Sequence, residues 1–168
     1  MQGSLRRVPP RPINHVGIGV PDIEAAIRWY GEVMGFALVS GPVDVRADAP
    51  GGDQAVDVLG PTFRHMRLAH LAGANGVGLE LFELIDPPHE RRPDVVEYWK
   101  SNTFHFCVTD PDIEAMVERI KTTGGTQLSR IWNERDASGT YRMCYCRDPF
   151  GTIVEIYTHS YELLQGHR

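Results

Sequence analysis

The sequence predicts an α+β protein of two tandem βαβββ modules, and three observations support this prediction. Residues 15–27 and 105–117, ninety positions apart, align without a gap and share a histidine, an Asp-Ile-Glu-Ala segment and their apolar positions. Each segment runs from a strand pattern into an amphipathic helix pattern. Each half then closes on an apolar strand that contains a glutamate, Leu79-Glu80-Leu81-Phe82 or Val154-Glu155-Ile156-Tyr157. An internal repeat of this kind sets the architecture.

The first module is expected to span residues 12–85. It begins with a strand over residues 13–20, where small and β-branched residues alternate. Asp22 then offers an acceptor to the free amides of a helix, and Gly35 is placed to end that helix. The apolar face of the helix recurs at steps of three and four residues and is formed by Ile23, Ala26, Ile27, Tyr30 and Met34.

The rest of the first module is expected to be three strands and one long loop. The stretch 41–60 holds several Gly, Pro and Asp residues without strong periodicity, so it is predicted to be a loop. The strands are expected at residues 36–40, 63–71 and 77–84.

The second module is expected to span residues 102–160 and to repeat this order. A proline-rich linker, residues 86–101, separates it from the first. Asp112 is placed to cap a helix that runs to about Thr122. Strands are expected at residues 104–109, 126–132, 140–147 and 152–158. Residues 12–160 would thus form a single domain, between a flexible arm at residues 1–11 and a short tail at residues 161–168.

Composition narrows the classes of function. The 168 residues carry a formal net charge of −5 without charge blocks, which disfavours partners such as nucleic acids or anionic membranes. No apolar run approaches the roughly 20 residues of a membrane span, and no apolar segment follows the charged N-terminus as in a secretory signal. Three cysteines, Cys107, Cys144 and Cys146, give no disulfide framework. They are expected to be small packing residues in a cytoplasmic protein.

The repeated histidines and glutamates form the candidate metal site. Alternate side chains of a strand share a face, so Glu80 points away from the flanking Leu79 and Leu81. Glu155 is flanked in the same way by apolar residues. A buried carboxylate is costly unless it is paired or metal-bound. Two imidazoles and two carboxylates in matching positions can satisfy one another through one divalent cation. The predicted ligands are His15, Glu80, His105 and Glu155.

Five other histidines have no histidine counterpart in the opposite half. They are therefore expected to be structural or surface residues, and they are His65, His70, His89, His159 and His167.

Four segments resemble the vicinal oxygen chelate superfamily, which contains glyoxalase I, methylmalonyl-CoA epimerase, extradiol dioxygenases and antibiotic-resistance proteins. The resemblance covers residues 12–158, and its segments are Asn14–Ile23, Trp29–Phe36, Gly78–Glu83 and Arg147–Glu155. It implies that the sheets of the two modules pair into a cupped, open mixed β-barrel with the helices outside. In glyoxalase-type and epimerase-type members, the metal ligands come from the first and last strands of each module.

The resemblance implies a metal-dependent lyase, isomerase or epimerase, closest to glyoxalase I and methylmalonyl-CoA epimerase. One divalent ion (zinc, nickel, cobalt or manganese) would chelate adjacent oxygens of a small substrate and stabilise an enolate. Glu80 and Glu155 are then candidate bases as well as ligands, and either can be the base. Homodimers are common in the superfamily. The two modules of one site can belong to one chain or to two.

An extradiol-type dioxygenase is the alternative enzyme. Its iron(II) would be held by His15, His105 and Glu155, and Tyr145 matches a tyrosine of the extradiol pattern. A histidine expected before that tyrosine is missing between Trp132 and Cys144. Tyr145 is thus a weaker catalytic candidate, and aromatic packing in a strand is the favoured interpretation.

A non-catalytic small-molecule binding protein, as in antibiotic resistance, is the third interpretation. Such proteins line their cleft with aromatic residues, and Trp29, Tyr30, Trp99 and Trp132 are available. Trp29 and Tyr30 fit helix packing better, and a full set of four ligands argues against a pure binder. Loops 41–60 and 87–101 are the expected contributors to specificity, with Arg46, Arg64, Arg91 and Arg92 available for an anionic substrate.

Overall fold

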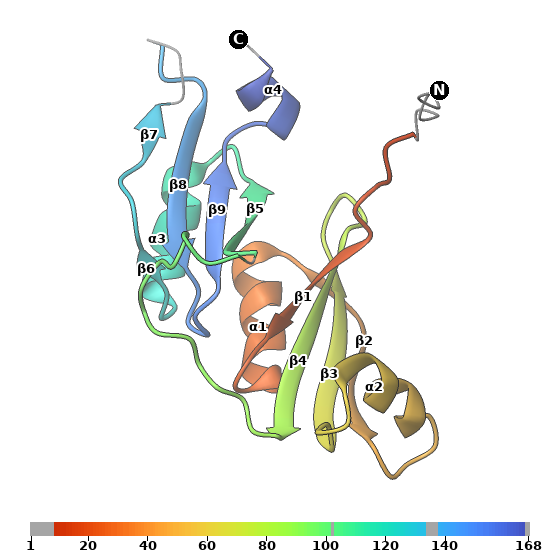
Figure 1. Ribbon diagram of the computed structural model, residues 1–168. Helices are drawn as coiled ribbons and strands as arrows, with labels where there is room; N and C mark the ends of the chain where they lie inside the picture. The colour runs from red at the N-terminus through yellow and green to blue at the C-terminus, as the bar shows by residue number, and fades with distance from the viewer. Residues whose placement is uncertain (1–8, 102, 134–137, 167–168) are drawn as a thin grey trace.

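A computed structural model describes residues 9–101, 103–133 and 138–166 of the chain (Figure 1). Residues 9–11 of the predicted arm are exposed coil, whereas residues 1–8 and His167 lie outside the described residues. None of the helices in the described part is long and apolar enough to cross a membrane.

The first module forms a four-stranded sheet in the order β1-β4-β3-β2. β1 pairs in parallel with β4, and the other pairs are antiparallel. Helix α1 (Ile23–Met34) connects β1 to β2. At its start, the Asp22 side chain accepts a hydrogen bond from the Ala25 amide at 2.9 Å. Gly35 ends the helix with φ of 72°. The strands are β1 (His15–Gly19), β2 (Ala37–Arg46), β3 (His65–Ala72) and β4 (Gly78–Asp86).

The second module repeats this topology. β5 pairs in parallel with β9, and β8 pairs antiparallel with β9, β6 and β7. Helix α3 (Ile113–Thr122) is capped by Asp112, whose side chain accepts from the Ala115 amide at 3.2 Å. The strands are β5 (His105–Thr109), β6 (Thr126–Gln127), β7 (Trp132–Asn133), β8 (Arg142–Arg147) and β9 (Ile153–Tyr157). The predicted strand at 126–132 is thus two short strands.

One hydrophobic core joins the two modules. Figure 1 shows α1 in the middle of the molecule, between the two sheets, and buried residues of α1, α3 and both sheets belong to a single cluster. Three hydrogen bonds tie α1 and its end to the second module: Trp29 Nε1 to Thr123 Oγ1 (3.0 Å), Tyr30 Oη to Asp148 Oδ2 (2.5 Å), and Arg119 Nη1 to the Val33 carbonyl (3.0 Å). The α+β prediction and the packing role of Trp29 and Tyr30 are confirmed. The described residues form two sheets without a closed barrel.

Two predicted irregular segments contain regular structure. Within the expected loop 41–60, β2 continues to Arg46 and is followed by helix α2 (Gly52–Leu59). The loop prediction was wrong because Ala55 of α2 packs with Phe63 and Met66 in a second small cluster, which local composition does not reveal. The expected tail contains helix α4 (Tyr161–Gln165), which buries Leu164.

Cysteine packing follows the prediction in part. Cys144 and Cys146 are fully buried on β8, whereas Cys107 on β5 is exposed. The difference follows from strand alternation, because the β5 side chains on either side of Cys107 face the core.

Candidate metal centre

His15 and Glu80 meet on one face of the first sheet. Glu80 lies opposite Gly17 in the register of β4 and β1, and His15 precedes Gly17 by two positions on the same face. His15 Nε2 lies 3.4 Å from Glu80 Oε2. Gly17 has no side chain between them, and a Cβ at this position would lie 3.0 Å from the Phe82 ring.

His105 and Glu155 form the matching pair on the second sheet. His105 Nε2 lies 3.2 Å from Glu155 Oε2. Glu155 is only 5% exposed, and its neighbours Val154 and Ile156 are fully buried on the opposite face. Strand pairing therefore builds the same imidazole–carboxylate pair twice, as the repeat predicts.

The third strand of each sheet adds a further polar group to each pair. His70 of β3 is the register partner of Glu80, and Tyr145 of β8 is the register partner of Glu155. His70 Nδ1 lies 3.3 Å from Glu80 Oε1. Partial burial, a hydrogen bond to Glu155 and the charge of Glu155 raise the pKa of the Tyr145 phenol.

The expectation that His70 is only structural or a surface residue missed this contact. A sequence signal for it existed, because His70 and Tyr145 each stand ten positions before the glutamate of their module. Only a histidine was sought at the equivalent position of the other half, so the equivalence of His70 and Tyr145 was missed. Of the other histidines, His65 pairs with Asp44 at 2.6 Å, away from the two pairs.

The donor chemistry of the first pair fits a divalent cation. His15 Nδ1 lies 2.8 Å from Asn14 Oδ1. A neutral imidazole that donates from Nδ1 to Asn14 Oδ1 has its lone pair at Nε2, which here faces a carboxylate oxygen. Two acceptors that face one another are satisfied by a cation between them. An outer hydrogen bond that orients the ring is also the usual support of a metal-bound histidine.

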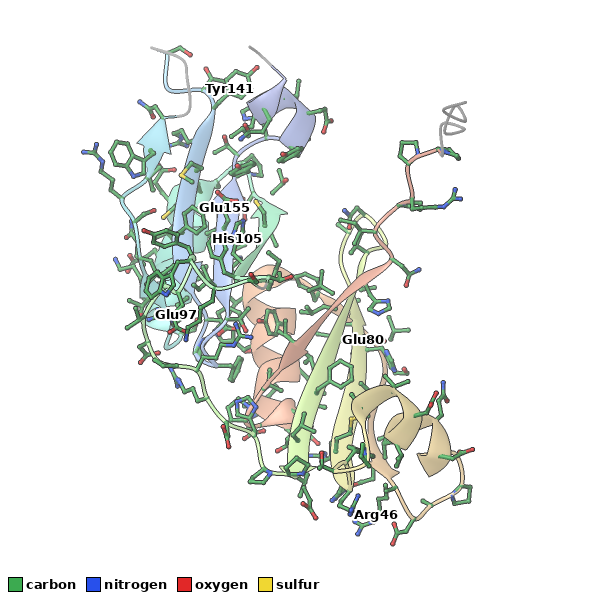
Figure 2. All side chains as sticks on the ribbon, viewed as in Figure 1. Arg46, Glu80, Glu97, His105, Tyr141 and Glu155 are labelled. Atoms are coloured by element: carbon green, nitrogen blue, oxygen red, sulfur yellow. The ribbon has the colours of Figure 1, made fainter. Side chains whose placement is uncertain are left out.

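The two pairs do not converge within one chain. Figure 2 shows Glu80 on the first sheet, well apart from His105 and Glu155 on the second. In the part of the chain that the structure describes, no three His, Cys, Asp or Glu side chains are grouped so that they hold a metal ion. Each module thus provides half of the predicted four-ligand set.

Aromatic rings surround the second pair. The rings of Phe104 and Tyr145 stack at 6.4 Å and 15°, and the Phe104 and Tyr145 centroids lie 4.3 and 5.2 Å from that of His105. Tyr145 also borders a hollow of about 400 Å³. That hollow is lined by Ser129, Trp132, Asn133, Met143 and Tyr145. The aromatic packing role of Tyr145 and its place beside Glu155 therefore coexist.

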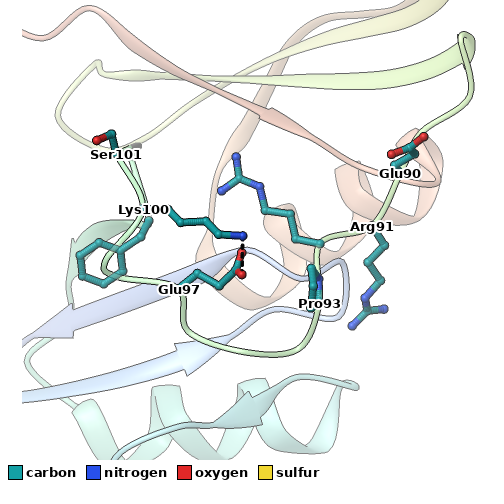
Figure 3. A pocket seen from close by; sticks show the side chains of 8 residues that line it. Glu90, Arg91, Pro93, Glu97, Lys100 and Ser101 are labelled. Carbon is teal, nitrogen blue, oxygen red and sulfur yellow. Dashed lines mark ion pairs between the residues drawn. The ribbon is translucent and has the colours of Figure 1, made fainter.

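A second hollow of about 400 Å³ lies under the linker and is mainly charged (Figure 3). Arg91, Arg92 and Lys100 line it together with Glu90 and Glu97, and Phe104 borders its inner side. Lys100 is paired with Glu97 at 2.6 Å, and Arg91 with Asp94 at 3.1 Å. The linker thus places charges of both signs beside Phe104, the residue that precedes His105.

Residues 12–156 match the model of the Glyoxalase/Bleomycin resistance protein/Dioxygenase superfamily. The chain belongs to this superfamily. Membership agrees with the repeated βαβββ topology and extends over both modules.

Two solved structures share the fold of this chain, and one further protein is similar to it in sequence. The glyoxalase family protein APC24694 from Bacillus cereus superposes with a TM-score of 0.69 at 22% identity, over 92% of this chain and 97% of that one. Glyoxalase I from Zea mays gives a TM-score of 0.59 at 18% identity, over 88% of this chain and 44% of that one. In sequence, virulence protein STM3117 of Salmonella typhimurium strain LT2 is 27% identical over 145 residues, 86% of this chain and 81% of that protein.

Proposed function

We propose that this superfamily member is a metal-dependent lyase, isomerase or epimerase of the glyoxalase type. The observation that carries the proposal is the pair of matching contacts, His15 with Glu80 at 3.4 Å and His105 with Glu155 at 3.2 Å. The four side chains would hold one divalent ion (zinc, nickel, cobalt or manganese). When bound, the ion supplies Lewis-acid stabilisation of negative charge on adjacent oxygens of a small substrate.

The glutamates have a second role in this proposal, which is proton transfer at the carbon next to the substrate oxygens. Glu155 is only 5% exposed, and its register partner is Tyr145. Glu80 lies on a more open surface, with its side chain 24% exposed. Both remain candidate bases, and their unequal surroundings suit different steps of one proton transfer.

The proposal includes a homodimer in which each site takes one module from each chain. Its support is the separation of Glu80 from His105 and Glu155 within one chain (Figure 2). A second copy can bring a His15–Glu80 pair to a His105–Glu155 pair without any change inside the shared core. Isologous pairing of this kind would create two identical sites for each dimer.

Metal analysis and an exchange assay test the proposal. Protein purified without added metal should contain about one divalent ion per chain by elemental analysis. It should then incorporate solvent deuterium into a 2-methyl-branched acyl-CoA or convert a hemithioacetal. Protein that binds none of zinc, nickel, cobalt or manganese contradicts the proposal.

An extradiol-type iron(II) dioxygenase is the second candidate, because Tyr145 lies beside both His105 and Glu155. His15 would complete its two-histidine, one-carboxylate set. Oxygen consumption with a panel of catechols tests it. Iron-loaded protein that consumes oxygen with a catechol would favour this candidate over the lyase or isomerase, whereas protein that never binds metal would favour a small-molecule binder.

A further inference from the structure

We propose that His70 is a positioning residue that fixes the carboxylate of Glu80 for metal binding. The inference rests on the proposed function, because it concerns how one of the four ligands is held. It adds a fifth side chain to the site and makes the two modules chemically different.

The contacts of Glu80 divide its two oxygens between two imidazoles. Oε2 faces His15 Nε2 at 3.4 Å, and Oε1 faces His70 Nδ1 at 3.3 Å. The close approach of the His70 ring to Oε1 restricts rotation of the carboxylate and leaves Oε2 on the side of His15. Outer partners of this kind orient metal-binding carboxylates.

The orientation of His70 is set by the sheet. Its neighbours Ala69 and Leu71 are buried in the core, so strand alternation directs His70 to the face that carries Glu80. The side chain is 37% exposed, so the contact lies at the border between the sheet and solvent.

An irregularity in β2 lies beside His70. Ser40 is its partner there, and the register shifts on both sides of this pair. Gly41 follows with φ of 92°, and a Cβ at this position would lie 2.6 Å from the Leu68 carbonyl oxygen. Bulges next to functional sites commonly re-aim a neighbouring side chain. The backbone of β2 is therefore irregular where it pairs with His70.

The second module has a different group in this place. Tyr145 supports Glu155 from the equivalent register position. One glutamate thus has an imidazole as its outer partner and the other has a phenol. In a site built from both modules, the two carboxylates would be held by different groups on opposite sides of the ion.

Cobalt(II) titration of the protein tests the role of His70. In His70→Ala the dissociation constant for Co²⁺ should rise about 10- to 100-fold, the usual effect of losing an outer partner. His70→Asn keeps an N–H donor at the position of Nδ1 and should recover part of the affinity. The visible absorption bands of bound Co²⁺ should keep their positions in both variants, because the ligands themselves are unchanged.

His65→Gln is the matched control, because His65 lies on the same strand but pairs with Asp44. Its affinity for Co²⁺ should equal that of the wild type, and circular dichroism and thermal melting verify that every variant is folded. Wild-type affinity in His70→Ala would overturn this inference alone. Shifted cobalt bands, or an affinity in His70→Asn as low as in His70→Ala, would overturn the positioning role in favour of direct ligation. A wild-type protein that binds no Co²⁺ would overturn the proposed function as well.

Discussion

Glu155 and Glu80 occupy equivalent positions on their strands but have unequal surroundings. The Glu155 side chain is 6% exposed and that of Glu80 is 24% exposed. A carboxylate as buried as Glu155 is costly unless it is paired with a proton or a cation. Glu155 is therefore the carboxylate that would gain more from the proposed ion as a partner.

Glu155→Gln should abolish turnover while leaving the fold intact. The amide has the shape of the carboxylate but neither its charge nor its basicity, so we expect metal affinity to fall at least about 10-fold and turnover about 10²- to 10⁴-fold. The melting temperature should stay equal or rise, because a buried charge is removed.

Glu83→Gln is the control for this change. Glu83 lies on β4 but pairs with Arg67 on the opposite face, so its loss should leave turnover unchanged. Full activity in Glu155→Gln would count directly against the site.

At the scale of elements, α1 is held to the second module by a buried hydrogen bond. Asp148 accepts from the Tyr30 hydroxyl at 2.5 Å and from the Phe150 and Thr152 amides at 2.9 and 2.7 Å. Burial raises the pKa of Asp148 above its ordinary value, and these donors oppose that rise. The turn after β8 is therefore organised around a single carboxylate.

Tyr30→Phe should lower the free energy of unfolding by about 1.5–3 kcal/mol at neutral pH, because a hydrogen bond to a charged group is lost. Removal of the donor raises the pKa of Asp148 further in the folded state. The loss of unfolding free energy should therefore be fully present above the Asp148 pKa of the folded variant. It should shrink as the pH falls through that pKa. Urea denaturation of the variant and the wild type from about pH 8 to about pH 5 measures this loss and its dependence on pH. A cost that grows on acidification would contradict this account.

The irregularity of β2 at Gly41 leads to a prediction about stability. Gly41→Ala should destabilise the protein by roughly 1–3 kcal/mol more than Gly76→Ala, because only the Gly41 Cβ meets backbone atoms. Both glycines have positive φ, 92° and 78°, so the comparison isolates the close approach to β3. Thermal denaturation of the two variants gives the difference. Equal costs would show that the β3 backbone can move away from the new Cβ.

For the whole molecule, subunit complementation tests whether a site combines two chains. His15→Ala removes a ligand of the first module and His105→Ala removes one of the second, so each variant alone should bind metal poorly. Unfolding and refolding the two variants together should restore about one quarter of the wild-type sites, because random mixing makes half the dimers mixed and each has one intact site. Co²⁺ titration of the mixture counts the restored sites. No gain over the separate variants would place all four ligands of a site in one chain.

The sequence alone determined the repeated βαβββ order, the helix caps at Asp22 and Asp112, and the His–Glu pair of each module. The strand and helix order and the caps depend on periodicity and spacing, which are local properties, whereas the His–Glu pairs were predicted from the internal repeat. Helix α2 was not predictable in this way, since Ala55 becomes buried only by contact with Phe63 and Met66. The contact of His70 with Glu80 was missed for a different reason, because the equivalent residue of the second module is Tyr145 and not a histidine. The tertiary structure alone decided that the two pairs lie apart within one chain, because the shared core around α1 sets the relative position of the two sheets.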